Sequence, residues 1–105
     1  GLNSAFGDWE DRDPIAAGNY LLSMPNSPKR DSAIRGFAEG YAWQDPKTAI
    51  AWAQDIQDPT IRNESLKKVG FAYYRRKPEE ARTWLTESGL SSETKAEILN
   101  SQRGR

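Results

Sequence analysis

The fold is decided by residues 45–76, DPKTAIAWAQDIQDPTIRNESLKKVGFAYYRR. In the first part of this stretch, apolar residues stand at positions i, i+3, i+4 and i+7: Ala49, Trp52, Ala53 and Ile56. This spacing places them on one face of a helix. Between residues 61 and 73 the apolar positions follow a similar helical spacing, with charged residues between them. The stretch therefore predicts two amphipathic helices joined by a short turn, because the strict alternation of a half-buried strand is missing.

The same pattern recurs at an offset of 32 residues. Proline stands once in each unit, at Pro14, Pro46 and Pro78. An aromatic residue follows each proline six positions later, as Tyr20, Trp52 and Trp84. A second aromatic series, in the other half of the unit, consists of Trp9, Tyr41 and Tyr73. A fixed period between 20 and 50 residues is typical of stacked repeats, in which each unit buries its apolar face against its neighbours.

We predict helices over residues 2–12, 14–24, 28–43, 46–56, 59–76, 78–87 and 91–101. The first of these aligns with the second helix of a unit, which gives a half repeat (1–12) followed by repeats 13–44, 45–76 and 77–105. We therefore expect a single all-α domain over residues 1–105. Its architecture would be a right-handed stack of helix–turn–helix repeats, an α-solenoid of about seven helices. Because the chain begins within a repeat, we expect it to be a fragment of a longer protein.

Local residues mark where these helices begin and end. Four dipeptides place a side-chain acceptor before a proline: Asp13-Pro14, Ser27-Pro28, Asp45-Pro46 and Asp58-Pro59. The acceptor caps a backbone N–H, and the proline lacks the donor that would stay unpaired in the first turn. Gly89 predicts a left-handed helix stop with an apolar contact from Leu90. Charged pairs four residues apart, such as Asp31–Arg35 and Glu64–Lys68, are expected to pair along the solvent faces of helices.

The two aromatic series are expected to fill the spaces between helices, since each large ring buries roughly 150–250 Å². Small residues opposite them would allow the helices to approach closely: Ala17, Ala38, Ala49, Gly70 and Ala81. The recurring Arg30 and Arg62 have two interpretations. They form either a ladder of ligand-binding guanidinium groups or, as we favour, a structural bridge to a neighbouring carboxylate or to carbonyls that end the preceding helix.

Composition excludes several classes of function. Fifteen basic residues balance fifteen acidic residues, so no overall field favours nucleic acid or an anionic membrane. The chain has neither histidine nor cysteine, which excludes disulfides, the usual zinc sites and histidine-based catalysis. No segment approaches the roughly 20 apolar residues of a membrane-spanning helix. We therefore expect no enzyme activity, no catalytic residues, no cofactor and no metal. The cellular compartment is left open.

The helix–turn–helix unit, with proline at each junction and the Ala-x-x-Trp pattern, resembles the tetratricopeptide-type repeats. The segment from Asp58 to Arg62, followed by Ser65, Leu66 and Val69, resembles instead the second helix of a HEAT repeat. Both resemblances cover nearly the whole chain at the level of architecture. Each implies a scaffold that binds partners rather than catalyses a reaction. The two families differ in which helix of each pair lines the concave surface, so the residues of that surface stay open.

Five residues are candidates for a partner-binding surface. Trp43 replaces the charged residues found at this position in the other units, so it either forms a binding contact or covers the loop before Pro46. The others are Tyr74 and the basic run that follows it, Arg75, Arg76 and Lys77. Aromatic and basic neighbours suit stacked bases and phosphates. A basic cluster at a helix C-terminus is equally explained by the helix dipole, which is the interpretation we favour.

The sequence thus predicts a non-enzymatic helical-repeat scaffold for a protein or peptide partner, a step that rests on analogy of fold. One alternative is a nucleic-acid-binding repeat that uses Lys67, Lys68, Arg75 and Arg76; the balanced net charge argues against it. A second alternative is a regulatory appendage of a larger enzyme. The acidic segment at residues 8–13 and the basic run at 75–77 also predict a weak head-to-tail self-association.

Overall fold

A computed structural model describes residues 13–101 of the chain, and in this range it contains six α-helices and no strand. The helices are α2 (Pro14–Ser23), α3 (Pro28–Tyr41), α4 (Pro46–Gln54), α5 (Pro59–Arg76), α6 (Pro78–Glu87) and α7 (Ser92–Asn100). The all-α prediction is confirmed. The helix predicted over residues 2–12, which would be the seventh, lies outside the described residues. Helices α3 and α4 each end two residues earlier than predicted.

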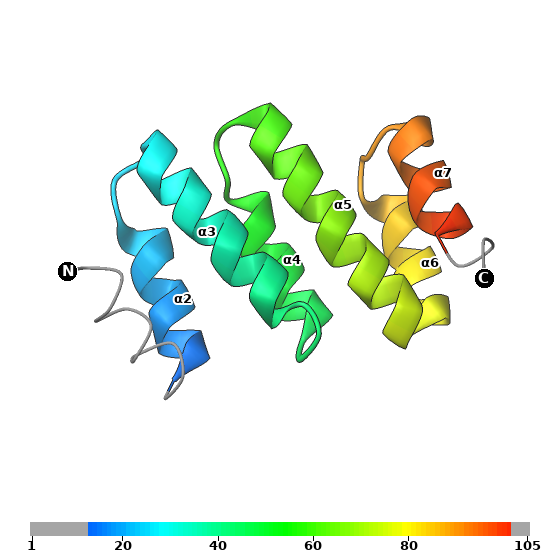
Figure 1. Cartoon of the computed structure of the whole chain (residues 1–105), viewed down its shortest axis with the longest axis horizontal. Helices are drawn as coiled ribbons and strands as arrows, with labels where there is room; N and C mark the ends of the chain where they lie inside the picture. Colours follow the sequence, from blue (N-terminus) through cyan, green and yellow to red (C-terminus); the bar gives the residue numbers. More distant parts are fainter. Residues whose placement is uncertain (1–12, 102–105) are drawn as a thin grey trace.

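Helix α5 is at the centre of the packing. It contacts α4 and α6, its neighbours along the chain, and also α3 and α7. Figure 1 shows α3, α5 and α7 side by side, with α4 and α6 behind them. Helices α3 and α5 contact each other extensively, whereas α2, α4 and α6 are joined mainly through α3 and α5. This packing between adjacent helices is compatible with a helical repeat, and it leaves space between α4 and α6.

Capping residues fix where the helices begin, as the sequence predicts. The Asp13 carboxylate accepts a hydrogen bond from the Ala16 N–H at 3.1 Å. Ser27, Asp45 and Asp58 cap α3, α4 and α5 in the same way, each before a proline. Lys77, which breaks this pattern before Pro78, makes no side-chain cap on α6. Gly89 follows α6 with φ of 76°, so the predicted left-handed stop is also confirmed.

Arg30 has the structural role that we favoured. Its side chain is 2% exposed and donates to the carbonyls of Leu21, at 3.1 Å, and Leu22, at 2.9 Å. It also forms an ion pair with Asp55, which follows α4. Neighbouring Asp31 accepts hydrogen bonds from the backbone N–H groups of Gln57 and Asp58, both at 3.0 Å. The two side chains therefore join α2 and α3 to the loop between α4 and α5.

Arg62, one repeat later, donates to the Ile56 carbonyl at 2.9 Å and to the Gln57 carbonyl at 3.4 Å. It thus binds carbonyl groups beyond the end of α4, as Arg30 binds those at the end of α2. Both guanidinium groups are occupied by backbone acceptors of their own chain. They do not form a ladder for ligands.

The small residues expected at close helix contacts are buried, with Ala17, Ala38, Ala49 and Ala81 all 0% exposed. The prediction for the aromatic residues is confirmed only in part. Trp52 and Tyr73 are 4% and 3% exposed, but Tyr20 is 42% exposed, which corrects its assignment to a filled space. The reason is positional. Trp52 packs against α2, whereas among the described residues no helix precedes α2 to cover Tyr20. Trp9 lies outside the described residues.

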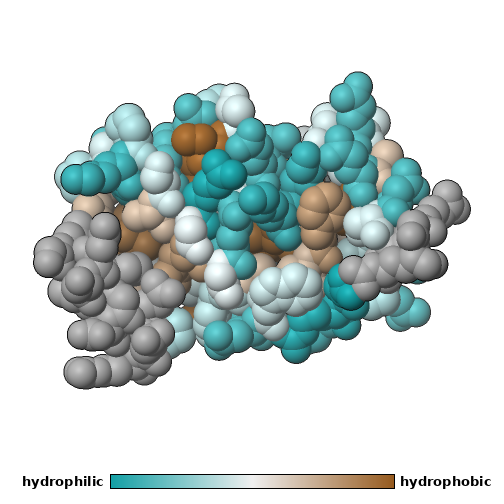
Figure 2. Space-filling view, viewed as in Figure 1, coloured by the Kyte–Doolittle hydropathy of each residue, from teal (hydrophilic) through white to brown (hydrophobic). Residues whose placement is uncertain are grey.

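The ion pairs on the solvent face of α3 and α5 run between helices rather than along them. Arg35 binds Glu64 at 3.3 Å, and Lys68 binds Glu39 at 3.5 Å. The predicted pairs Asp31–Arg35 and Glu64–Lys68 are not formed, because Asp31 caps a loop and Glu64 faces Arg35 of α3. Hydrophilic side chains accordingly cover most of this face, with apolar residues visible between them (Figure 2).

Candidate docking groove between α4 and α6

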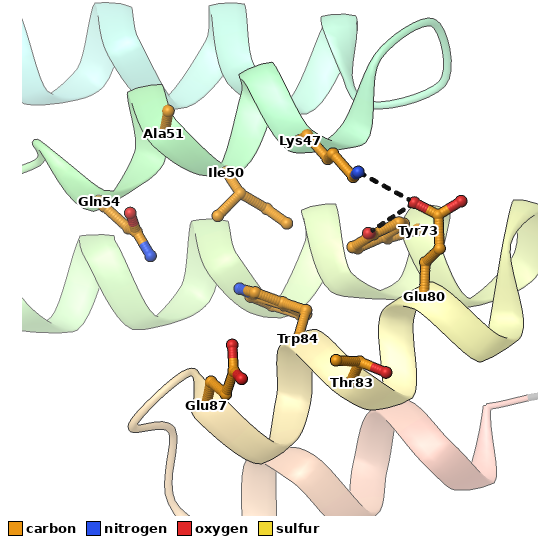
Figure 3. Close-up of a pocket in the computed structure, with 9 residues that line it drawn as sticks. All are labelled: Lys47, Ile50, Ala51, Gln54, Tyr73, Glu80, Thr83, Trp84 and Glu87. Atoms are coloured by element: carbon orange, nitrogen blue, oxygen red, sulfur yellow. Dashed lines mark hydrogen bonds and ion pairs between the residues drawn. The ribbon is translucent and has the colours of Figure 1, made fainter.

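An open groove of about 500 Å³ lies between α4 and α6. Figure 3 shows the side chains around it, with those of α4 facing those of α6 and Tyr73 of α5 behind them. The lining residues are Lys47, Ile50, Ala51, Gln54, Tyr73, Glu80, Thr83, Trp84 and Glu87. Apolar side chains occupy the middle of this set and polar side chains occupy both ends.

One end of the groove is closed by a polar network that has no free capacity for a cation. Lys47 Nζ lies 3.2 Å from Glu80 Oε1, and the Tyr73 hydroxyl donates to the same oxygen at 3.3 Å. The hydrogen bond between Lys47 and Glu80 raises the pKa of the lysine and lowers the pKa of the glutamate. Burial, followed by the charge of Glu80, raises the pKa of Tyr73. At neutral pH the network therefore holds one ammonium group, one carboxylate and one neutral phenol.

The middle of the groove is apolar. Ile50 is 6% exposed and lies opposite the partly buried ring of Trp84 (Figure 3). The indole N–H of Trp84 is buried and has no hydrogen-bond partner. A buried donor without an acceptor costs about 1–3 kcal/mol. The groove thus combines an apolar contact surface with an unsatisfied donor beneath it.

The other end of the groove carries acceptors that no cation occupies. Gln54 and Glu87 are the last residues of α4 and α6, and both side chains are exposed. Figure 3 places them at the same end, opposite Lys47 and Glu80. Glu87 forms no ion pair with any residue in the range 13–101. Two helix C-termini add partial negative charge here, because their last carbonyls lack partners within the helix.

The corresponding space between α2 and α4 is filled. Trp52, which stands 32 residues before Trp84, packs its ring against Gly18 of α2 so closely that a Cβ at Gly18 would collide with it. The same ring contacts Phe37 and Tyr41, with centroid distances of 4.4 and 5.1 Å. Only 4% of Trp52 is exposed. In this pair of helices, tryptophan therefore occupies the space that is open between α4 and α6.

A glycine that changes place explains the difference. Ile50 stands on α4 where α2 has Gly18, so Trp84 cannot insert against α4 as Trp52 inserts against α2. On α5, Gly70 stands where α3 has Ala38. A Cβ at Gly70 would lie 3.1 Å from the Trp84 ring, which shows that the ring leans on α5 instead. The groove between α4 and α6 is left open as a result.

The candidate surface residues predicted from the sequence lie outside this groove. Trp43 is 52% exposed in the turn after α3, so it does not serve as a buried cover for the loop before Pro46. Arg75, Arg76 and Lys77 are exposed at the end of α5, where the helix dipole favours them. No hydrogen bond or ring contact joins Trp43 to this basic run, although all four residues are described.

Tyr74 is a packing residue, with 8% of its surface exposed. The Arg82 guanidinium lies 5.6 Å from the centre of its ring and donates to its hydroxyl at 3.2 Å. Of the other basic residues considered for nucleic acid, Lys67 pairs with Glu97 at 2.9 Å and Lys68 pairs with Glu39. Most of the acidic segment at residues 8–13 lies outside the described residues, so the predicted head-to-tail contact remains a prediction.

Comparison with known proteins adds no assignment, since no family model, curated protein or solved structure matches the chain. Within the described range, no helix has the length and apolar character needed to cross a membrane. No group of acidic residues suited to a metal ion occurs over residues 13–101.

The groove residues Ile50, Trp84 and Glu87 were not predicted from the sequence. The exchange of glycine between positions 18 and 50 was the available signal, because it breaks the repeat at a close contact. Its meaning depends on knowing that the tryptophan ring points at this position, which spacing alone does not give.

Proposed function

We propose that this chain is a non-enzymatic helical-repeat scaffold that binds a peptide segment of a protein partner in the groove between α4 and α6. In this proposal the helices are part of an α-solenoid, with units stacked as in tetratricopeptide-type or HEAT-type repeats. The 32-residue period and the packing of α3, α5 and α7 in one row support it. Binding along such a surface is the usual role of this architecture.

The observation that carries the proposal is the contrast between two equivalent spaces. Between α2 and α4 the chain fills the space with Trp52, whereas between α4 and α6 it leaves an apolar surface around Ile50 and Trp84. An apolar cleft with a few polar groups at its edge is the usual composition of a binding site. A bound segment also brings backbone carbonyls, which would supply the acceptor that the Trp84 N–H lacks. The paired state of Lys67 and Lys68 favours this function over nucleic-acid binding.

The test is to fill the groove. Ala51 is exposed on the α4 side, so Ala51→Trp should occupy the open space without disturbing the core. Lys29→Trp, at an exposed position on α3 outside the groove, is the matched control. Twelve-residue peptides selected from a random phage-displayed library would be measured against all three proteins by calorimetry.

We expect the selected peptides to bind the wild type and Lys29→Trp equally, and Ala51→Trp at least about tenfold more weakly. Circular dichroism should give the same helix content for all three proteins. Equal affinity for Ala51→Trp, or a library that yields no binder, would refute the proposed function.

A further inference from the structure

On the basis of the proposed function, we infer the chemistry of the bound segment. The structure assigns to the groove a peptide that places an apolar side chain over Ile50 and Trp84 and a neighbouring arginine or lysine against Glu87. The inference rests on the charge and polarity of the two ends of the groove, and on what the chain itself places at the equivalent of Glu87.

The chain provides an internal precedent for a cation at this position. Asp55 stands 32 residues before Glu87, and both follow or end a helix of the same row. The Asp55 carboxylate is paired with the Arg30 guanidinium. Arg62, the equivalent of Arg30 in the next unit, instead binds the carbonyls of Ile56 and Gln57. Glu87 therefore lacks the guanidinium that its counterpart has.

The electrostatics of the groove select the orientation of the peptide. At the end that holds Lys47 and Glu80, opposite charges already neutralise each other at 3.2 Å. At the opposite end, Glu87, the Gln54 amide oxygen and two helix C-termini all favour a donor or a positive charge. A peptide carboxylate there would be repelled. The basic residue of the partner is thus expected at the end formed by Gln54 and Glu87.

The experiment uses the same random twelve-residue library on the full chain, followed by affinities of the selected peptides for Glu87 variants. We expect the selected sequences to be enriched in arginine or lysine within a few positions of an aliphatic or aromatic residue. Glu87→Gln should weaken binding about three- to fivefold, since an exposed ion pair contributes modestly. Glu87→Lys should weaken it about tenfold, and Glu93→Lys, the same charge change on exposed α7, should leave it unchanged.

Salt provides a second readout. Raising the ionic strength from 50 to 500 mM should weaken binding to the wild type more than binding to Glu87→Gln, because screening acts on the charge pair.

The outcomes separate this inference from the function on which it rests. Peptides that Ala51→Trp excludes, but that lack basic residues and bind Glu87→Lys normally, would overturn the inference and leave the docking groove intact. Peptides that bind Ala51→Trp normally would refute the groove itself. Sedimentation analysis tests the other occupant. A concentration-dependent dimer that Ala51→Trp dissociates would place a second copy in the groove and would overturn a peptide ligand.

Discussion

At the scale of single residues, two glycines determine where the tryptophan rings lie. Gly18 lets Trp52 reach the backbone of α2, and Gly70 lets Trp84 lie against α5. Interiors are close-packed, so even one added carbon at such a contact must displace its neighbours. The same repeat position therefore gives a filled space in one unit and an open groove in the next. This difference arises without any change in the tryptophan itself.

Gly18→Ala should destabilise the protein. Alanine favours the helix over glycine by about 1 kcal/mol, but its Cβ would collide with the Trp52 ring, and overpacking typically costs 1–3 kcal/mol. Gly36→Ala is the control, because no atom lies within 4 Å of a Cβ at this helical position. It should gain about 0.5–1 kcal/mol. Urea unfolding measures both changes, and a Gly18→Ala protein as stable as Gly36→Ala would contradict the packing described here.

Arg30 and Arg62 share a repeat position but differ in how much depends on them. Arg30 is 2% exposed and binds two carbonyls of α2 as well as Asp55. Arg30→Met would leave these acceptors without a donor and should cost about 2–3 kcal/mol. Arg62 is partly exposed, so water can replace it, and Arg62→Met should cost about 1 kcal/mol. Equal losses for the two variants in chemical denaturation would show that Arg30 does not join the units.

At the scale of helices, the start of α4 makes stability depend on pH. A hydrogen bond from the Thr48 hydroxyl, at 2.7 Å, is the main cause that lowers the pKa of the Asp45 carboxyl, and the Thr48 N–H adds to it. Because the pKa is lower in the folded state, the stabilising contribution is complete above the unfolded value of about 3.9. It is lost as the pH falls through the lower, folded value.

Asp45→Ala should therefore cost about 1 kcal/mol at pH 7, as expected for the loss of an N-cap. The stability difference from the wild type should shrink as the pH falls below about 4, where the wild-type carboxyl becomes protonated. Thermal unfolding followed by circular dichroism between pH 7 and pH 2.5 measures this difference. A gap that stays constant down to pH 2.5 would rule out the carboxylate as the source of the capping energy.

The starts of the helices were predicted accurately because each depends on residues that are adjacent in the sequence, such as Asp45 and Pro46. The ends of α3 and α4 were less certain, since no glycine marks them as Gly89 marks the end of α6. Pairs such as Arg35–Glu64 depend on how two helices are aligned, which helical spacing does not specify. The groove was missed for the same reason. It depends on the side toward which Trp84 inserts, a consequence of contacts among three helices.

At the scale of the whole molecule, α5 connects both sides of the fold, and the groove lies behind it between α4 and α6 (Figure 1). The face of α3 and α5 is covered by ion pairs that the chain forms with itself. The groove combines an apolar middle with a carboxylate that has no internal cation. On this account, the region around the groove binds a partner while the opposite face remains solvated.

The most direct test is a titration of the isotope-labelled chain with a selected basic–apolar peptide, followed by NMR spectroscopy. Such a titration locates a binding site residue by residue. The account predicts shifts in the Trp84 indole N–H, the Ile50 methyl groups and the Gln54 amide, with the Trp52 indole unchanged. Shifts confined to Trp43 and the basic run at Arg75 and Arg76, or equal shifts at Trp52 and Trp84, would contradict it.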